Sequence, residues 1–263
     1  MLILVSIDGM RPDGLAQANT PSIDRLIEQG ASTMSAQTVM PCCTLPCHTS
    51  MVRGVDATRH GITTNTFQPL VRPVPSIFDL ANQHGLKCGF FFNWGPLRDL
   101  CDPESLIVSK FIRDSFRPEG DDRVAQAAVD YINEEPLDLM FLYLGYTDEC
   151  GHQTSWMSPE YIAAIENADR CVGRVLEAAG NPTVLLLSDH GGHDRTHGTE
   201  APEDMTIPWI LSGPGAKEGV TIDQPVIIYD TAPTIAYLLN LPIPREWDGK
   251  PVAEALEGVE GMS

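Results

Sequence analysis

The sequence has no apolar run long enough to cross a lipid bilayer. A membrane span needs about 20 consecutive apolar residues, and the N-terminal run Leu2-Ile3-Leu4-Val5 is followed within three residues by Asp8. The run also lacks the basic segment that opens a secretory signal, so we interpret it as the first strand of a folded domain. We therefore expect no association with a membrane and a cytoplasmic location, unless a leader was removed from the chain.

Basic residues are scarce. Lys and Arg number 17 against 36 Asp and Glu, which gives a formal net charge of −19. Proteins that hold a nucleic-acid backbone do so with clustered Lys and Arg, so we expect no nucleic-acid polymer as a partner. A small anionic substrate stays compatible with this charge, because metal ions can supply positive charge locally.

Disulfides are also not expected. The seven cysteines are an odd number, and in a cytoplasmic protein they favour reduced thiols. Cys42, Cys43 and Cys47 cluster, and this cluster admits two interpretations. A thiolate zinc site is one; small buried side chains that pack like other hydrophobes are the preferred one.

What the sequence does contain is the composition of an ordinary globular protein, with 43% hydrophobic and 20% charged residues. Apolar strands alternate with helical segments, which predicts an α/β fold with a mostly parallel central sheet and helices on both faces. No repeat or linker divides residues 1–263, so a single domain is expected. The expected strands are 2–7, 32–39, 87–93, 139–145, 184–187 and 206–212, and the expected helices are 20–30, one beginning near 44, 75–84, 120–134, 158–179 and one capped by Asp230. Coil and a short terminal helix are expected after Leu241.

The stretch 188–199 contains three histidines, two aspartates and three glycines directly after the apolar run 184–187. Polar residues just past the carboxyl ends of parallel strands are where open α/β sheets build their sites. Imidazole and carboxylate groups together suit a divalent transition ion, and glycines let the backbone turn sharply around it. The alternative is a solvated polar loop, and the remaining clusters of the chain argue against it.

Three further clusters occupy comparable positions. Asp8 follows the first strand, and Asp148 and His152 follow the strand at 139–145, where we expect a tight turn across Gly151. Thr44 lies near the start of a helix, where free backbone N–H groups and the helix dipole favour an oxyanion. Three carboxylates, three imidazoles and a hydroxyl are enough for two metal ions about 4 Å apart, which can clamp the attacking and leaving oxygens of an in-line displacement.

Five motifs follow one another along the chain: Asp8-Gly9, Cys43-Thr44-Leu45-Pro46 with His48, Asp148-x-x-Gly151-His152, Asp189-His190-Gly191 and His197-Gly198. In this order they resemble the motifs of the alkaline phosphatase superfamily, and most closely those of the nucleotide pyrophosphatase/phosphodiesterase branch. The resemblance implies an alkaline-phosphatase-like three-layer sandwich and extends from residue 2 to about 245.

The resemblance also implies a role for each site residue. Thr44 would be the nucleophile that takes the phosphoryl group, and Asn65 would hydrogen-bond a non-bridging phosphate oxygen together with the backbone N–H of Thr44. Two metals with separate ligands are implied. The first would lie beside Thr44, and the second would activate the water that cleaves the phospho-threonine. The first set is Asp8, Asp189 and His190, and the second set is Asp148, His152 and His197. His193 is the alternative to His197, which is preferred because the last ligand of the family lies in His-Gly-Thr.

Departures from the wider superfamily narrow the substrate. Related sulfatases have a modified cysteine in the position of Thr44, which argues against sulfate esters. Asn65 is neutral, which favours a singly charged diester or pyrophosphate, although Arg11, Arg53 and Arg59 are close enough in sequence to weaken that inference.

Nucleotide preference stays open, because Leu45 replaces the aromatic residue that larger relatives place after the nucleophile. Trp94 either stacks on the substrate or packs in the core.

The sequence thus predicts a two-metal hydrolase of phosphodiester or pyrophosphate bonds in small molecules, with nucleotides among the candidates. Three imidazoles favour zinc, and manganese is also compatible. A phosphonate hydrolase of the phosphonoacetate type or a phosphomonoesterase on the same site is the alternative. A metal-binding protein without catalysis is a third possibility, but it would have no use for Thr44 or Asn65.

Overall fold

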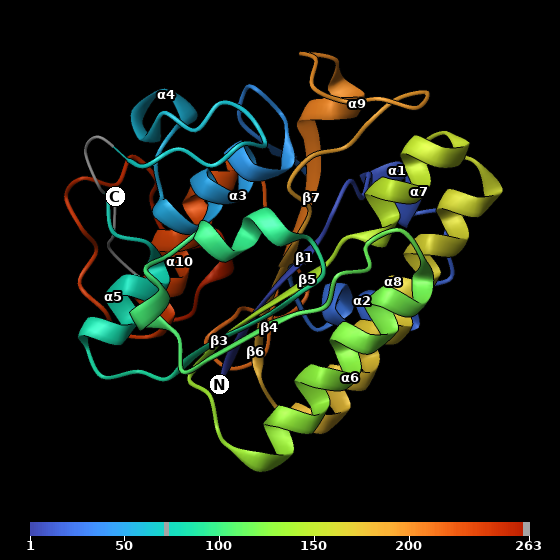
Figure 1. Ribbon diagram of the computed structural model, residues 1–263. Coiled ribbons are helices and arrows are strands. Elements are labelled where there is room, and N and C mark those ends of the chain that lie inside the picture. Colours follow the sequence, from blue (N-terminus) through green and yellow to red (C-terminus); the bar gives the residue numbers. More distant parts are fainter. Residues whose placement is uncertain (71–73, 260–263) are drawn as a thin grey trace.

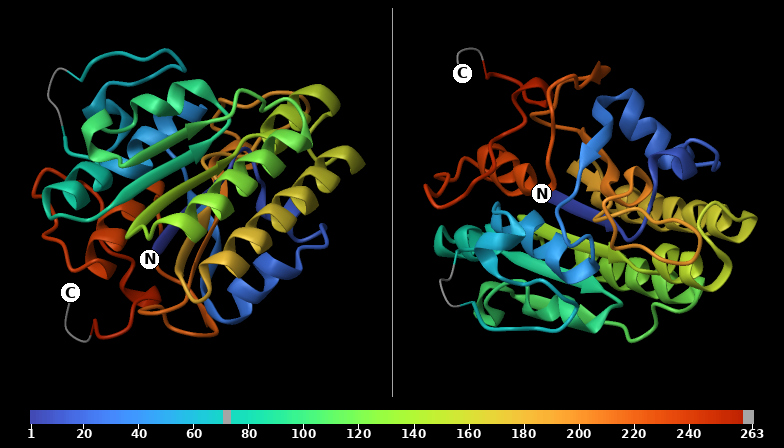
Figure 2. Two further views of the ribbon diagram at one scale, coloured as in Figure 1. Left: turned by 60° about the horizontal axis from the view of Figure 1, so that its bottom comes forward. Right: turned by 90° about the horizontal axis from the view of Figure 1, so that it is seen from above.

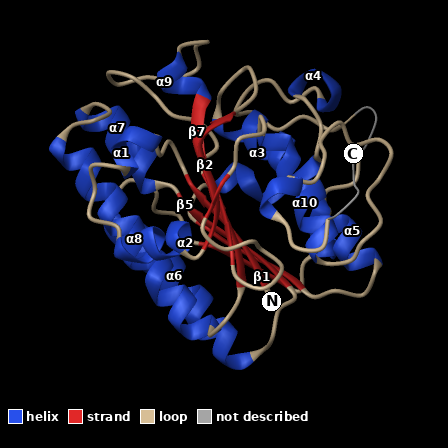
Figure 3. Ribbon diagram, turned by 180° about the vertical axis from the view of Figure 1, so that it is seen from behind, coloured by secondary structure: helices blue, strands red, loops and turns tan. Residues whose placement is uncertain are grey.

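The computed structural model describes residues 1–70 and 74–259, and its strands form one eight-stranded sheet with helices on both faces (Figures 1 and 3). The strand order is β4-β3-β5-β1-β6-β7-β2-β8. β7 runs antiparallel to its neighbours β6 and β2, and the other pairs are parallel. The predicted α/β class with a mostly parallel sheet is confirmed. The strands are β1 Leu2–Ile7, β2 Gly30–Gln37, β3 Cys88–Phe92, β4 Val108–Phe111, β5 Leu139–Leu144, β6 Thr183–Leu187, β7 Thr206–Ser212 and β8 Val220–Thr221.

The six strands expected from the sequence are present, with ends that differ by at most two residues. The two strands that the sequence did not indicate, β4 and β8, lie at the two edges of the sheet. β4 is mostly exposed and β8 contains two residues. An edge strand of this kind needs no buried apolar run, so the pattern that identified the central strands is missing there.

Helices cover the two faces of the sheet, and Figures 1 and 2 show them as two layers. Side chains of β1 alternate between the layers. Leu2 and Leu4 pack with α3, α5 and α10, whereas Ile3, Val5 and Ile7 pack with α2, α6 and α8. Burial on both faces explains why the central strands are continuously apolar. The helices are α1 Pro12–Leu15, α2 Pro21–Glu28, α3 Thr44–Arg53, α4 Ala57–His60, α5 Ile77–Gln83, α6 Pro118–Glu134, α7 Tyr146–Thr154, α8 Pro159–Ala179, α9 Pro202–Met205 and α10 Thr231–Leu238.

The tight turn expected around Asp148 and His152 is wrong, because this segment is helix α7. The sequence reasoning treated Gly151 as a turn residue. In the structure Gly151 lies inside the helix, where an added Cβ would come within 2.7 Å of the indole of Trp156. The glycine therefore permits close packing, and it is not there for a turn.

Two expectations for the C-terminal region also differ from the structure. Asp230 does not cap α10 through its side chain; its carboxylate accepts hydrogen bonds from the backbone N–H groups of Ile227 and Lys250. The expected terminal helix is a single 3-10 turn at Ala253–Ala255 within the described part of the tail, and residues 260–263 lie outside it.

Among the described residues, no helix is long and apolar enough to cross a membrane.

Candidate metal centre and active site

Three neighbouring central strands place the acidic residues at the carboxyl end of the sheet. β1 lies between β5 and β6, and all three run parallel, so their carboxyl ends meet. Asp8 follows β1 directly, Asp148 lies in the first turn of α7 after β5, and Asp189 follows β6. Gly9 has a positive φ of 66°, and an added Cβ would lie 3.1 Å from the Cα of Asp148. This glycine therefore lets the chain after β1 approach α7 closely.

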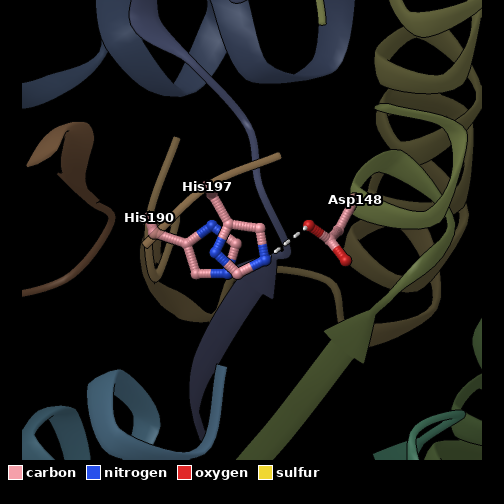
Figure 4. Close-up of side chains that lie close together, drawn as sticks. All are labelled: Asp148, His190 and His197. Carbon is pink, nitrogen blue, oxygen red and sulfur yellow. Dashed lines mark ion pairs between the residues drawn. The ribbon is translucent and has the colours of Figure 1, made fainter. Parts of the chain in front are cut away.

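The side chains form two adjoining clusters in which the potential ligand atoms lie within 4.8 Å of one another. The first contains Asp8, Asp189 and His190, and the second contains Asp148, His190 and His197. His190 Nε2 lies 3.4 Å from Asp8 Oδ1 and 3.3 Å from Asp189 Oδ2. In Figure 4 the rings of His190 and His197 lie face to face, and His197 Nε2 is 3.7 Å from Asp148 Oδ1.

His152 lies beside the second cluster. Its Nε2 atom is 3.5 Å from Asp148 Oδ2, and its ring centroid is 5.1 Å from that of His197. The structure therefore brings together all six residues that the sequence nominated as metal ligands, with His152 at the exposed side of the group.

All three histidines are oriented in the same way. Nδ1 of His190, His197 and His152 lies 2.8, 2.9 and 2.9 Å from the backbone carbonyl oxygens of Gly191, Cys42 and Arg195 respectively. A carbonyl oxygen only accepts, so each Nδ1 carries the hydrogen and each Nε2 keeps a free lone pair. This is how a metal-binding histidine is held by its surroundings. Burial and the neighbouring His190 also lower the pKa of His197 to about 3, which keeps its imidazole neutral.

Four buried atoms at the centre of the group have no hydrogen-bond partner: Asp8 Oδ1, Asp148 Oδ1, Asp189 Oδ2 and His190 Nε2. Unpaired buried acceptors are costly and rare. Burial, followed by the negative charges of Asp189 and Asp148, raises the pKa of Asp8 well above its ordinary value. A divalent cation would satisfy these acceptors and offset the repulsion between the carboxylates, so the residues present fit the two-metal interpretation.

Thr44 faces this group from the start of α3. The preceding residue, Cys43, is extended and gives the helix no side-chain cap, and every residue of α3 is buried. A cavity of about 150 Å³ is lined by Thr44, Asn65 and Trp94 together with Asp8, Asp148, His152 and His197. Asn65 Oδ1 accepts a hydrogen bond of 2.9 Å from the backbone N–H of Leu45, which leaves its amide hydrogens as donors for a ligand.

His193, the alternative to His197, lies outside both clusters. Its Nδ1 atom is 2.7 Å from Asp204 Oδ1, and the other oxygen of Asp204 accepts hydrogen bonds from Thr199. His193 and Thr199 are thus both held by Asp204, which ties together the loop that follows β6.

The three arginines near the motifs are also engaged elsewhere. Arg11 pairs with Asp13, Arg59 with Asp248, and Arg53 donates to the carbonyl oxygens of Val74 and Leu100. None of them lines the cavity formed by the described residues.

The cysteines near Thr44 have free thiols and belong to neither cluster. Cys42 and Cys47 are buried, and the thiol of Cys42 donates to the carbonyl oxygen of Thr199.

Sequence reasoning missed three residues that contact or line the site, and it named a fourth, His48, only as part of a motif and without a role. The hydroxyl of Tyr143 donates to Asp8 Oδ2, and His48 lies between Thr44 and Asp189. Ser115 and Glu149 line the cavity. Tyr143 is the one polar side chain in the apolar strand β5, which was an available signal. Ser115 follows the edge strand β4, which the sequence did not indicate, and nothing local predicts where its side chain lies.

Residues 2–200 match the family described as type I phosphodiesterase / nucleotide pyrophosphatase. The match covers more than half of the chain, and the chain belongs to this family. It is 26% identical to human ectonucleotide pyrophosphatase/phosphodiesterase family member 7 over 216 residues, which are 72% of this chain and 47% of the relative. It is also 28% identical to a 2,3-bisphosphoglycerate-independent phosphoglycerate mutase of Clostridium kluyveri over 170 residues, 61% of this chain and 33% of that protein. The chain thus spans about half the length, or less, of these curated relatives.

Solved structures share the fold. Human ectonucleotide pyrophosphatase/phosphodiesterase 5 has a TM-score of 0.81 at 17% identity, covering 97% of this chain and 99% of that chain. An inactive variant of murine ectonucleotide pyrophosphatase/phosphodiesterase 5, in complex with AMP, has a TM-score of 0.78 at 16% identity, covering 94% of this chain and 97% of that chain. A 2-O GAG sulfatase has a TM-score of 0.78 at 18% identity, covering 98% of this chain and 74% of that chain.

Proposed function

We propose that the chain is a single hydrolase domain that cleaves phosphodiester or pyrophosphate bonds of small molecules through a covalent phospho-threonine. Family membership supports phosphoester chemistry. The observation that carries the proposal is the shared cavity. Thr44, at the start of a buried helix, lines the same 150 Å³ space as Asp8 of one cluster and Asp148 and His197 of the other.

The metal ligands in this proposal are two sets. Asp8, Asp189 and His190 hold one divalent ion, and Asp148, His152 and His197 hold the other, with zinc favoured by the three imidazoles. When bound, the two ions lower the pKa of a coordinated hydroxyl and neutralise charge on the reacting oxygens.

The chain's own groups then carry the covalent step. Thr44 Oγ1 forms a bond to phosphorus as the bond to the leaving oxygen breaks, and water later cleaves the phospho-threonine and regenerates the hydroxyl. The amide of Asn65 donates to a non-bridging oxygen. The backbone N–H of Thr44, at the first position of α3, and the positive end of the helix dipole favour the negative charge that develops there.

A diester is favoured over a monoester because the cavity offers no Lys or Arg among the described residues that line it. A monoester carries a second negative charge, which superfamily members that cleave it balance with a basic residue. Here Asn65 occupies that neighbourhood and is neutral.

The test compares metal-loaded protein on bis-p-nitrophenyl phosphate, p-nitrophenyl phosphate and phosphonoacetate, with the metal content measured in parallel. We expect the diester to be cleaved fastest and about two ions per chain. Much faster turnover of the monoester or of phosphonoacetate would assign the site to the alternative chemistry, and less than one ion per chain in active protein would contradict the two-ion scheme.

The matched variant is Thr44→Ala. Because a covalent step disappears, we expect turnover to fall by at least about 10³-fold while the metal content stays unchanged. Thr44→Ser keeps a hydroxyl and is expected to keep measurable activity. Unchanged turnover in Thr44→Ala would remove Thr44 from the mechanism.

A further inference from the structure

The cavity beside Thr44 has a wall that the proposed chemistry does not use. Trp94 follows β3, Ser115 lies in the loop after β4, and Glu149 is the residue next to Asp148 on α7. All three line the same cavity as Thr44 and Asn65. Trp94 and Glu149 are half-buried and Ser115 is buried, so these groups are partly removed from water, and Trp94 also packs against the hydrophobic core.

Glu149 has no cationic partner among the described residues. Within residues 1–70 and 74–259, its only polar contact from a side chain is Ser115 Oγ, 3.5 Å from Oε1, and no Lys or Arg of that part lines the cavity. A carboxylate that faces the space occupied by a phosphate repels an anionic substrate, and the low polarity of a partly buried site strengthens that repulsion. Glu149 therefore makes the binding of a diester that carries only negative charge less favourable.

The charges of the site show what would offset this cost. Asp8, Asp148 and Asp189 contribute three negative charges, and two divalent ions contribute four positive ones. The remaining single positive charge is offset by the Thr44 oxygen once its hydroxyl is ionised, so the negative charge of a phosphodiester is already uncompensated. Glu149 adds one more negative charge, so a substrate with a positive charge on an ester substituent would reduce the imbalance.

We propose that Trp94, Ser115 and Glu149 form a subsite for a protonated primary amine carried by an ester substituent of the substrate, as in a 2-aminoethyl phosphodiester. This inference rests on the proposed function and specifies its substrate class. The carboxylate of Glu149 and the hydroxyl of Ser115 are hydrogen-bond acceptors, which suit the N–H groups of a primary ammonium. The indole of Trp94 supplies an electron-rich ring face for the same cation.

The experiment uses two substrates of nearly equal size with the same leaving group, p-nitrophenyl 2-aminoethyl phosphate and p-nitrophenyl propyl phosphate. Below the pKa of the amine they differ by one positive charge. We expect the metal-loaded protein to prefer the aminoethyl ester by about tenfold or more in kcat/KM. In Glu149→Gln we expect this preference to fall to within about twofold, mainly through a higher KM for the aminoethyl ester.

Glu160→Gln is the matched control, because it makes the same change of charge on the exposed first turn of α8, away from the cavity. It is expected to keep the full preference. Metal content and Tm are measured for both variants, so that loss of an ion bound through the adjacent Asp148 is not mistaken for loss of the subsite.

The outcomes separate the two proposals. If the wild-type protein cleaves both esters equally well, the subsite is wrong and the phosphodiesterase assignment stands. If it cleaves neither, the assignment fails and the subsite fails with it. p-Nitrophenyl phosphocholine, whose quaternary ammonium has no N–H group, is expected to be the poorer cationic substrate; a higher kcat/KM for it would contradict the primary-amine assignment. These comparisons use wild-type protein and do not depend on whether Glu149→Gln folds.

Discussion

At the scale of single residues, the site depends on side chains that hold the candidate ligands without being ligands themselves. His48 is the clearest case. It is fully buried one turn after Thr44, with Nδ1 2.7 Å from the carbonyl oxygen of Thr44 and 3.4 Å from Asp189 Oδ2. Its Nε2 atom is 2.8 Å from the hydroxyl of Ser6 in β1. One imidazole thus connects the helix of the nucleophile to a candidate ligand and to the central strand.

We predict that His48→Leu weakens metal binding by about 10- to 100-fold, because it removes the ring that lies 3.4 Å from Asp189 Oδ2 and joins α3 to β1 through Thr44 and Ser6. A fall in kcat/KM should accompany the loss when metal is limiting, and excess metal should restore part of it. Metal affinity is measured by competition with a chromogenic chelator.

His84→Leu provides the control for this prediction. His84 also places Nδ1 near the carbonyl oxygen four residues earlier, at 2.9 Å from Leu80 O, but it lies at the end of α5 and away from the site. This variant is expected to bind metal normally. Equal loss of affinity in both variants would mean that His48 contributes only to general stability.

At the scale of elements, helix α7 carries Asp148, Glu149 and His152, so its placement decides the geometry of the site. Its N-cap residue, Gly145, has no side chain to cap the helix. Asp121 of α6 takes that function: its Oδ1 atom accepts hydrogen bonds from the backbone N–H groups of Gly145 and Tyr146 and from Asn93 Nδ2. Asp121 is fully buried. Burial raises its pKa to about 7, although the hydrogen bonds that its carboxylate accepts act to lower the pKa.

A raised pKa means that the folded state holds its proton more tightly than the unfolded state, whose value is near 3.8. The free energy of unfolding should therefore decrease as the pH rises from about 4 to about 7, by at most about 4 kcal/mol from this group. Asp121→Asn keeps an acceptor oxygen and loses the charge. We predict that its stability relative to wild type increases between pH 5 and pH 8, as measured by urea unfolding.

Asp122→Asn is the comparison for this prediction, because Asp122 is the next residue of the same helix and its side chain is 44% exposed. Its stability relative to wild type is expected to change little over the same range. If the stability of Asp121→Asn relative to wild type were also independent of pH, the buried carboxyl would have the same pKa in the folded and unfolded states.

At the scale of the whole molecule, metal binding and folding are expected to be linked. Three carboxylates on three different segments meet in a buried cluster, and the chain already carries a formal net charge of −19. Without cations their repulsion opposes the folded state, whereas in the unfolded chain they are far apart.

We predict that removing the ions with a chelator lowers Tm by at least about 5 °C and that added zinc restores it. His190 belongs to both clusters, so His190→Ala should show a much smaller change on chelation. A wild-type Tm that does not depend on chelator or zinc would argue against a resident metal pair.

Much of the molecule could be predicted from the sequence, for a physical reason. Strands buried on both faces must be continuously apolar, so β1, β5 and β6 could be recognised as short hydrophobic runs. Parallel strands place the residues that follow them at the same end of the sheet, beyond the strands' carboxyl ends. The positions of Asp8, Asp148 and Asp189 followed from this rule. The helical form of 146–154 did not, because Gly151 is a packing residue and only its neighbour Trp156 reveals this.

The sequence by itself determined the fold class and the chemical character of the site, because both depend on local pattern and on residue type. Only the tertiary structure decided that the Nδ1 atoms of three histidines face backbone carbonyls, that His48 reaches Asp189, and that Glu149 shares a cavity with Thr44 and Trp94. Apart from the contact of His190 with the adjacent Gly191, those contacts join segments about 40 to 150 residues apart. No local pattern encodes such pairings, since they arise from how helices and loops pack on the finished sheet.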